Sequence, residues 1–280
     1  MPWAPSLPPR RDVTLPRRGT LSVREASGPE GAPTFVLLHG LTATADLNWF
    51  SVFEPLAEIG SVLAPDQRGH GDGIRDRHLS LETLADDVAA LLDERDLASC
   101  ILVGFSMGGA VSQLVWRRHR PRVRGRVLVA TAARFPSGAA QRSMWAAMAT
   151  AGPLLERVRP RLEDLAVRRA QRGAAPNPRQ VWAQAQLRRN EPLDLLSARR
   201  SLAGFCSMPW CRSIDVPASF VLTARDQVVP PEHQNELIAA LGDCEVESID
   251  AEHGAFIEAP ELFAPAVVRA ARSVAARVAR

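Results

Sequence analysis

The hydrophobic and polar positions of this chain follow two alternating patterns. Short apolar runs recur along the sequence, and the longer segments between them carry apolar residues at the spacing of amphipathic helices. The short runs predict strands over residues 21–26, 34–38, 61–64, 100–105, 127–131, 219–223 and 245–249.

Helical patterns are clearest in two of the intervening segments. In residues 81–95, Leu84, Val88 and Leu91 share one helical face with acidic residues opposite, and residues 232–241 behave similarly. Strands that alternate with such helices are typical of a mostly parallel sheet covered by helices. The pattern therefore predicts the α/β fold class.

The alternation stops between about residues 135 and 213, where Gly and Pro interrupt helical pieces and no strand is evident. Residues 134–213 also hold 14 arginines against 5 acidic residues, whereas the remainder of the chain is net acidic. We expect a basic helical cap at 134–213, inserted into a core formed by residues 19–133 and 214–280. Its arginines either cover solvated helix faces or steer an anionic substrate towards the site.

Residues 1–18 contain five prolines and two arginine pairs, and they predict a solvated basic tail. They lack the apolar region of a secretory signal, and no later run reaches the ~18 apolar residues that a membrane span requires. We therefore expect a cytoplasmic protein with no transmembrane segment.

Composition excludes several classes of enzyme. The chain has 280 residues, of which 46% are hydrophobic and 23% charged, as in ordinary folded proteins. All 34 basic residues are arginine, and there is no lysine and no tyrosine. Schiff-base enzymes, phosphate-loop ATPases and kinases are excluded because they need a lysine. A net charge of +3 without interleaved aromatic residues gives no indication of nucleic-acid binding.

The cysteines and histidines indicate neither a metal site nor a cofactor. The four cysteines form no C-x-x-C pair, and reduced thiols are expected, with a Cys206–Cys211 disulfide as the lesser alternative. No histidine lies at metal-ligand spacing. The oligomeric state cannot be inferred from the sequence.

The segment from Gly104 to Gly109 carries the strongest chemical signal. It reads Gly-Phe-Ser-Met-Gly-Gly between a predicted strand and a predicted helix, which is the pattern of a nucleophile elbow. In such an elbow a strained backbone projects the serine, and small flanking residues let strand and helix approach. Ser106 is the predicted nucleophile.

The strand at residues 34–38 runs into His39, Gly40 and Leu41. The backbone N–H groups of Leu41 and Met107 are the candidate donors of an oxyanion hole, because both follow strands that end near the predicted serine. His39 is expected to brace this loop rather than to transfer protons, since a better base lies elsewhere.

That base is His253, which follows the last predicted strand. Asp226 follows the preceding strand and would hold the imidazole. The chain order is then Ser106, Asp226, His253, one of the recurrent orders of a catalytic triad. Asp250 is a rival acid but is poorly aimed, because it lies three residues before the histidine.

These motifs together resemble the α/β-hydrolase superfamily: His39-Gly40, the loop at residues 66–71, the elbow at 104–109, Asp226 and His253. The resemblance implies an eight-stranded, mostly parallel sheet, with the helical segment after the sixth strand forming a cap over the active site. It also implies Ser106 as nucleophile, His253 as acid–base and Asp226 as its orienter.

Residue types that some members of this superfamily require are absent from this chain, and their absence excludes those members. Haloalkane dehalogenases and epoxide hydrolases use an aspartate nucleophile, and hydroxynitrile lyases use a cap lysine, so neither fits this chain. Carbon–carbon hydrolases typically have Asn where this chain has Phe105, which makes them less favoured, and enol-lactonases remain possible.

We expect a serine hydrolase that cleaves a carboxylic ester, lactone or thioester of a small acyl substrate, with anionic substrates preferred, through an acyl-enzyme. The alternatives are a carbon–carbon hydrolase or an acyltransferase with the same triad, or a non-catalytic binding module. Apolar residues of the cap would line an acyl pocket or form the cap's own core: Met144, Trp145, Met148, Phe205, Met208 and Trp210.

Overall fold

The computed structural model describes residues 3–76, 79–135 and 177–279. Its centre is an eight-stranded sheet in the order β1-β2-β4-β3-β5-β6-β7-β8, in which β2 is antiparallel to both neighbours and the other pairs are parallel. The strands are β1 (Arg10–Leu15), β2 (Gly19–Ala26), β3 (Thr34–Leu38), β4 (Ser61–Pro65), β5 (Cys100–Phe105), β6 (Val123–Val129), β7 (Ala218–Thr223) and β8 (Cys244–Ile249).

The first strand corrects one expectation. Residues 1–18 were expected to form a solvated tail, but β1 pairs along its whole length with β2. The reason is the alternation within its sequence, where Val13 and Leu15 are buried between polar neighbours. The prolines and arginines of residues 1–18 obscured the strand pattern of this segment. With β1, the sheet has eight strands.

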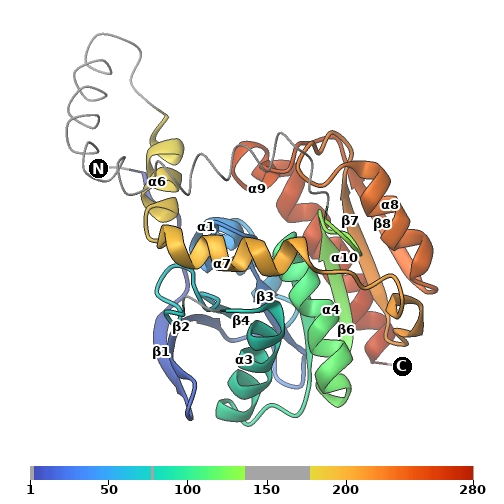
Figure 1. The fold of residues 1–280 in the computed structure, drawn as a ribbon, viewed down its shortest axis with the longest axis horizontal. Coiled ribbons are helices and arrows are strands. Elements are labelled where there is room, and N and C mark those ends of the chain that lie inside the picture. Colours follow the sequence, from blue (N-terminus) through green and yellow to red (C-terminus); the bar gives the residue numbers. More distant parts are fainter. Residues whose placement is uncertain (1–2, 77–78, 136–176, 280) are drawn as a thin grey trace.

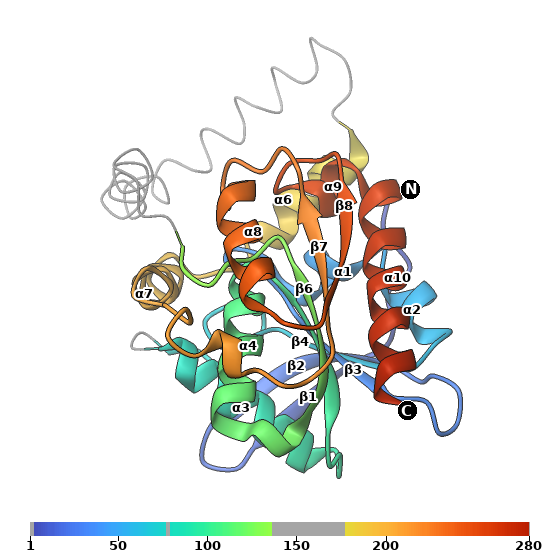
Figure 2. The same cartoon turned by 90° about the vertical axis from the view of Figure 1, so that its right-hand side faces the viewer.

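Helices cover both faces of the sheet (Figure 1). The view in Figure 2 separates them, with α3, α4 and α8 on one side and α2 and α10 on the other. The core helices are α1 (Ala45–Trp49), α2 (Phe53–Ala57), α3 (Leu81–Glu94), α4 (Met107–His119), α8 (Pro231–Ala240), α9 (Ala255–Glu258) and α10 (Pro260–Val278), and a short 3-10 turn, η1 (Arg120–Arg122), follows α4.

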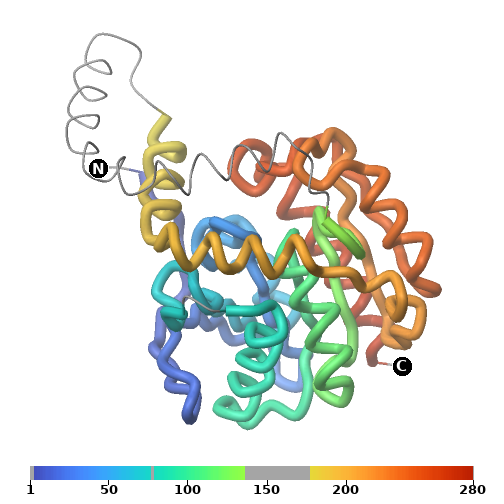
Figure 3. Tube along the Cα trace, viewed as in Figure 1, coloured from blue at the N-terminus to red at the C-terminus, as the bar shows by residue number. Residues whose placement is uncertain are grey.

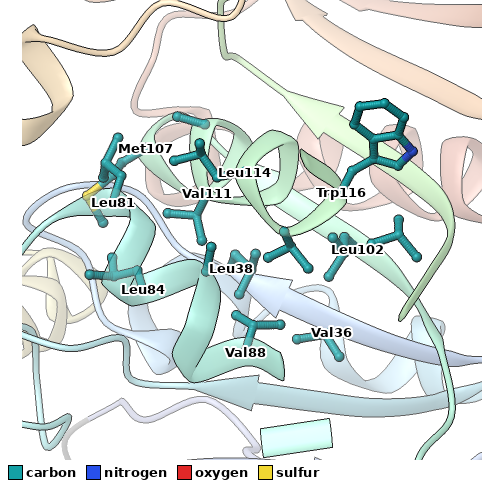
Figure 4. Close-up of a cluster of buried hydrophobic side chains, with 14 of the residues drawn as sticks. Val36, Leu38, Leu81, Leu84, Val88, Leu102, Met107, Val111, Leu114 and Trp116 are labelled. Carbon is teal, nitrogen blue, oxygen red and sulfur yellow. The ribbon is translucent and has the colours of Figure 1, made fainter. Parts of the chain in front are cut away.

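Each layer of helices buries its own apolar cluster against the sheet. Between the sheet and α3 and α4, Leu84 and Val88 pack with Val36, Leu102 and Val111, as Figure 4 shows. A second cluster lies under α2 and α10 on the opposite face. The strand β5 is buried along its whole length, which explains its continuous apolar sequence and fixes the elbow that follows it.

The insertion between β6 and β7 is helical where the structure describes it. It contains α6 (Pro178–Leu187), α7 (Pro192–Ala203) and the 3-10 turn η2 (Cys211–Ser213). Figure 3 shows α6 and α7, in yellow and orange, meeting at a corner beside the cyan loop that follows β4.

Polar contacts hold this corner to the core. The Asn190 side chain accepts from the Gly71 N–H at 2.9 Å and donates to the Thr42 carbonyl at 2.6 Å. Arg189 forms ion pairs with Asp46, Asp66 and Asp72. At least part of the insertion's positive charge therefore serves to bind the acidic core.

Within the described ranges, no helix combines the length and the apolarity that crossing a bilayer requires. All four cysteines are free thiols, with Cys206 exposed and Cys211 buried, so the alternative of a disulfide between these two is not realised.

Candidate active site

The predicted functional residues gather at one edge of the sheet. Ser106 directly follows β5, Asp226 follows β7 and His253 follows β8. Because β3 to β8 run parallel, their carboxyl ends meet at the same edge, which is where open α/β sheets place their sites. The sheet topology alone thus brings together side chains that are up to 147 residues apart.

Ser106 has the strained backbone that an elbow requires. Its φ angle is +51°, which non-glycine residues rarely adopt. Three contacts hold this conformation: the Ser106 N–H donates to the Val129 carbonyl at 2.9 Å, and the Ser106 carbonyl accepts from Thr131 Oγ1 at 2.7 Å and from the Gly109 N–H at 2.9 Å. The neighbouring strand therefore fixes the serine as much as its own turn does.

The glycines of the motif allow close packing around the elbow. A Cβ atom on Gly104 would overlap the Gly108 carbonyl, and one on Gly108 would overlap the Leu38 carbonyl of β3. The first turn of α4 is thus pressed against both β5 and β3. This contact sets the start of α4 beside the loop that follows β3.

His253 lies between the serine and the aspartate. Its Nε2 is 3.1 Å from Ser106 Oγ, and its Nδ1 is 2.7 Å from Asp226 Oδ2. A carboxylate oxygen only accepts, so Nδ1 carries the proton and Nε2 is left to accept from the serine hydroxyl. The imidazole is therefore in the tautomer that a general base for Ser106 needs.

Several hydrogen-bond donors fix the carboxylate of the buried Asp226. Its Oδ1 accepts from the N–H groups of Val228 and Val229 at 2.9 and 2.8 Å, and its Oδ2 accepts from Thr223 Oγ1 at 2.7 Å. Gln234 also donates to Thr223 Oγ1, at 2.9 Å. The carboxylate is thus oriented independently of the histidine. The rival Asp250 is exposed and pairs with Arg225.

The loop after β3 lies against the serine. A Cβ atom on Gly40 would stand 3.5 Å from the Ser106 Cβ and 2.8 Å from the Phe105 ring. The Gly40 N–H donates to Asn48 Oδ1 at 2.9 Å, which fixes the backbone just before Leu41. Gly40 is therefore a neighbour of Ser106, as an oxyanion hole built from the N–H groups of the residues that follow them would require.

His39 braces this loop from within the core. Its Nδ1 is 2.9 Å from the Gly40 carbonyl, and its Nε2 is 2.9 Å from the Gln67 backbone nitrogen. The Gln67 N–H must be a donor, so Nε2 is unprotonated and Nδ1–H donates to Gly40. Burial lowers the pKa of His39 to about 4, which keeps the ring neutral at physiological pH.

Three of the predicted pocket residues, Phe205, Met208 and Trp210, lie in the described parts of the chain. Trp210 stacks on Trp116 with ring centroids 6.4 Å apart, and Trp116 lies ten residues beyond Ser106 on the same helix, about 15 Å along its axis. Phe205 and Met208 belong to the same apolar cluster. The contact of Trp210 with Trp116 is apolar packing, the second of the two roles expected for these residues, and a pocket role for them stays a prediction. Met144, Trp145 and Met148 lie outside the described residues.

A comparison with known families supports the same fold. A sequence profile of the alpha/beta hydrolase fold matches residues 33–260. This chain belongs to the α/β-hydrolase fold family. The matched range of this α/β hydrolase contains residues 39–41, the elbow at 104–109, Asp226 and His253.

Curated relatives match shorter stretches of this α/β hydrolase. The chain is 39% identical over 106 residues to the dihydrolipoyllysine-residue acetyltransferase component of an acetoin cleaving system from Pseudomonas putida, covering 38% of this chain and 28% of that protein. It is 34% identical over 111 residues to the mouse sn-1-specific diacylglycerol lipase ABHD11, covering 39% and 36%. The matches thus span about a third of the length of these relatives.

Among solved structures, the enol-lactonase from Burkholderia xenovorans LB400 is similar with a TM-score of 0.76 and 23% identity, covering 94% of this chain and 100% of that one. At this identity the likeness establishes the fold of the α/β hydrolase and no more.

In the part of the chain that the structure describes, no three His, Cys, Asp or Glu side chains are arranged to hold a metal ion.

Sequence reasoning missed the residues that support the triad. Thr131, Thr223 and Gln234 carry no motif, and each acts through a contact that only the fold creates. One weak signal was present, because both threonines lie at the carboxyl ends of predicted strands, where polar side chains reach the site edge.

Proposed function

We propose that this α/β hydrolase is a serine hydrolase that cleaves the acyl bond of a small carboxylic ester, lactone or thioester. The observation that carries the proposal is the continuous contact from Asp226 Oδ2 through the His253 ring to Ser106 Oγ, at 2.7 and 3.1 Å. A hydroxyl, a base in the correct tautomer and a buried carboxylate in this order are the parts that nucleophilic acyl transfer needs.

In the first half-reaction, Ser106 Oγ attacks the substrate carbonyl carbon while its proton passes to His253 Nε2. The carbonyl oxygen becomes an oxyanion, which the Leu41 and Met107 N–H groups stabilise. The start of α4 adds favourable potential, because helix N-termini attract negative charge. When the intermediate collapses, the bond to the leaving group breaks and His253 returns the proton to the departing alkoxide or thiolate.

In the second half-reaction, water takes the place of the serine. His253 Nε2 accepts a proton from the water as its oxygen attacks the acyl carbon, and the same two N–H groups hold the new oxyanion. Collapse breaks the bond to Ser106, which recovers its proton from His253. The products are a carboxylic acid and the free enzyme.

An acyltransferase would use the same acyl-enzyme and differ only in the second nucleophile. Turnover of an activated ester with and without an added alcohol separates the two outcomes. Hydrolysis yields the free acid in both cases, whereas acyl transfer yields the new ester and a faster second step.

The test is labelling with a fluorophosphonate probe, which modifies only an activated serine. Wild type is expected to be labelled at Ser106, as mapped by mass spectrometry of the modified peptide, and Ser106→Ala and His253→Ala are expected to lose the label. Ser112→Ala is the matched control, because Ser112 lies on α4 and is buried, and its hydroxyl has no hydrogen-bond partner within the described chain. A folded wild-type protein that takes no label would refute an activated Ser106.

A further inference from the structure

One arginine of the sheet is buried without a hydrogen-bond partner among the described residues. Arg126 lies in the middle of β6 and is 0% exposed. Its Nε, Nη1 and Nη2 atoms have no hydrogen-bond partner among the described residues. Arginine has five N–H donors and is almost never fully buried unless it is paired. The described chain supplies no acceptor to this side chain, and an acceptor from outside reaches its nitrogen atoms only once the side chain turns towards an adjoining space, since it is 0% exposed as it stands.

The charged groups around Arg126 do not neutralise it. Asp215 accepts from Trp116 Nε1 at 3.2 Å and pairs with Arg120, and Asp243 pairs with Arg277 at 3.0 Å. Each of these acids thus has its own cation.

Two cysteines also lie close enough to affect the charge of Arg126. Burial raises the pKa of the Cys244 thiol to about 11 and also raises that of Cys211, so both thiols are neutral at physiological pH. The pKa of Arg126 itself falls to about 10 through burial, which still leaves the guanidinium charged at neutral pH.

Arg126 lines a pocket of about 290 Å³. Its other walls are formed by the segment before β7, residues 214–218, and the turn before β8, residues 241–243. Both segments lie at the amino ends of their strands, the sheet edge opposite α9 in Figure 2. The pocket is thus separated from Ser106 by the length of the sheet, about 20 Å for a six-residue strand.

We propose that this pocket binds a small organic monocarboxylate, held by Arg126. A guanidinium matches a carboxylate with two parallel N–H···O bonds, and such pairs are strong when water is excluded. Ile214, Val216, Pro217 and Leu241 add apolar surface to the walls, against which a short aliphatic body attached to that carboxylate would pack.

Size and charge select this class of ligand over inorganic anions. A single water occupies about 30 Å³ of liquid, so chloride would leave most of the pocket unfilled. Phosphate would bring a second negative charge towards Asp215 and Asp243, which also line the pocket. A monocarboxylate with a short aliphatic chain satisfies Arg126 without that repulsion. The inference does not depend on the proposed hydrolase activity.

The experiment measures the unfolding temperature of the full chain in sodium butyrate, with sodium chloride at equal ionic strength as reference. Wild type is expected to show a saturable rise of about 3 °C at about ten times the dissociation constant. Arg126→Met keeps the bulk and removes the charge, so it is expected to lose the rise. Without butyrate it should be at least as stable as wild type, because the uncompensated charge is gone.

A matched control removes a nearby charge outside the pocket. Arg212→Met, in η2, is expected to keep the full response to butyrate. A rise that persists in Arg126→Met would place butyrate at another site, including the Ser106 edge, and would overturn the proposal. A larger rise with sodium phosphate than with butyrate would overturn the carboxylate class.

The stability of Arg126→Met tests whether Arg126 has an ion-pair partner within the chain. An Arg126→Met protein that unfolds well below wild type in chloride alone, together with Asp215→Asn showing the same loss, would mean that Arg126 pairs with Asp215. That result would also overturn the proposal. Crystals soaked with 2-bromobutyrate are expected to show anomalous bromine density in the pocket beside residue 126 and none in Arg126→Met.

Discussion

At the scale of single residues, the site depends on how each polar atom is held. Asp226 uses both carboxylate oxygens, with Oδ1 committed to two backbone N–H groups and Oδ2 shared between Thr223 and His253. Because the backbone groups can only donate, whatever occupies the Oδ1 position must accept. This constraint decides what a conservative substitution would do.

Asp226→Asn is expected to lower kcat for an activated ester by about 10³–10⁴-fold. The Asn carbonyl would take the Oδ1 position, because the Val228 and Val229 N–H groups require an acceptor there. Its NH₂ group would then face His253 Nδ1 and force the proton onto Nε2. In that tautomer the ring cannot accept the serine proton. Steady-state kinetics with a p-nitrophenyl ester measures the effect.

Asp250→Asn is the matched control, since Asp250 is exposed and three residues from His253. It is expected to leave kcat within about twofold, as surface substitutions usually do. Equal losses in the two variants, or a large drop in the unfolding temperature of Asp226→Asn alone, would argue against a tautomer effect.

The residues that sequence reasoning identified share one property: each lies in a local motif or just after a predicted strand. Ser106 was recognisable because its turn needs glycine on both sides, and His253 and Asp226 because they follow the last two strands. Arg126 was not, because nothing in Val-Arg-Gly-Arg-Val distinguishes the buried arginine from the exposed Arg124. Only the packing around β6 makes that distinction.

At the scale of elements, the corner between α6 and α7 attaches the segment between β6 and β7 to the core. Arg189 reaches the carboxylates of Asp66, which follows β4, and Asp46, which lies in α1, and both are buried. Burial raises the pKa of Asp66, while Arg189 acts in the opposite direction and favours its ionised form. Removing the arginine would leave this carboxylate without its cation.

Arg189→Met is expected to lower the free energy of unfolding by about 2 kcal/mol, because it leaves a buried charge uncompensated. Urea unfolding followed by circular dichroism measures the change. Arg200→Met, an exposed position on α7, is expected to change the stability by no more than about 0.5 kcal/mol. Similar small effects in both variants would mean that Asp66 is satisfied without Arg189.

The hydrophobic pattern predicted seven of the eight strands but misassigned the first. β1 is short, lies at the edge of the sheet and buries only Val13 and Leu15, so its pattern is too brief to separate from a polar tail. For Trp210 the sequence left two roles open. Its apolar character is the same whether it faces a substrate or Trp116, and no sequence pattern distinguishes the two.

At the scale of the whole molecule, two buried histidines couple stability to pH. Burial lowers the pKa of His39 to about 4 and that of His70 to about 3, and their rings are neighbours, with centroids 5.1 Å apart. An unfolded chain binds protons on these rings near pH 6.5. Stability from both histidines is therefore complete above pH 6.5 and is lost as the pH falls towards their folded values.

The free energy of unfolding is expected to decrease between pH 6.5 and 4, with about 3 kcal/mol of the loss due to His39 alone. Asp66 opposes this trend, because its raised pKa means that the folded protein binds its proton more tightly. Asp72 and Asp86 have lowered pKa values and act at lower pH. Urea unfolding at a series of pH values measures the slope.

His70→Asn tests the assignment. The Asn amide can replace Nδ1–H as donor to the Arg68 carbonyl, now 3.0 Å from the ring nitrogen, while removing the titrating group. A shallower slope is expected in this variant, and an unchanged slope in His233→Asn, a partly exposed position on α8. An unchanged slope in both would assign the acid sensitivity to other groups.

The path of the chain around the insertion has an evolutionary consequence. Arg134 and Cys206 form an isolated β-bridge, so the backbone enters and leaves the intervening segment at adjacent points. Between these two points, segments of different length can be exchanged at little cost, since the entropy of closing a loop grows only slowly with its length. Ser106, Asp226 and His253 lie outside that segment, in the part of the chain that carries the sheet. Recombination at this bridge would thus replace the intervening segment while leaving Ser106, His253 and Asp226 in place.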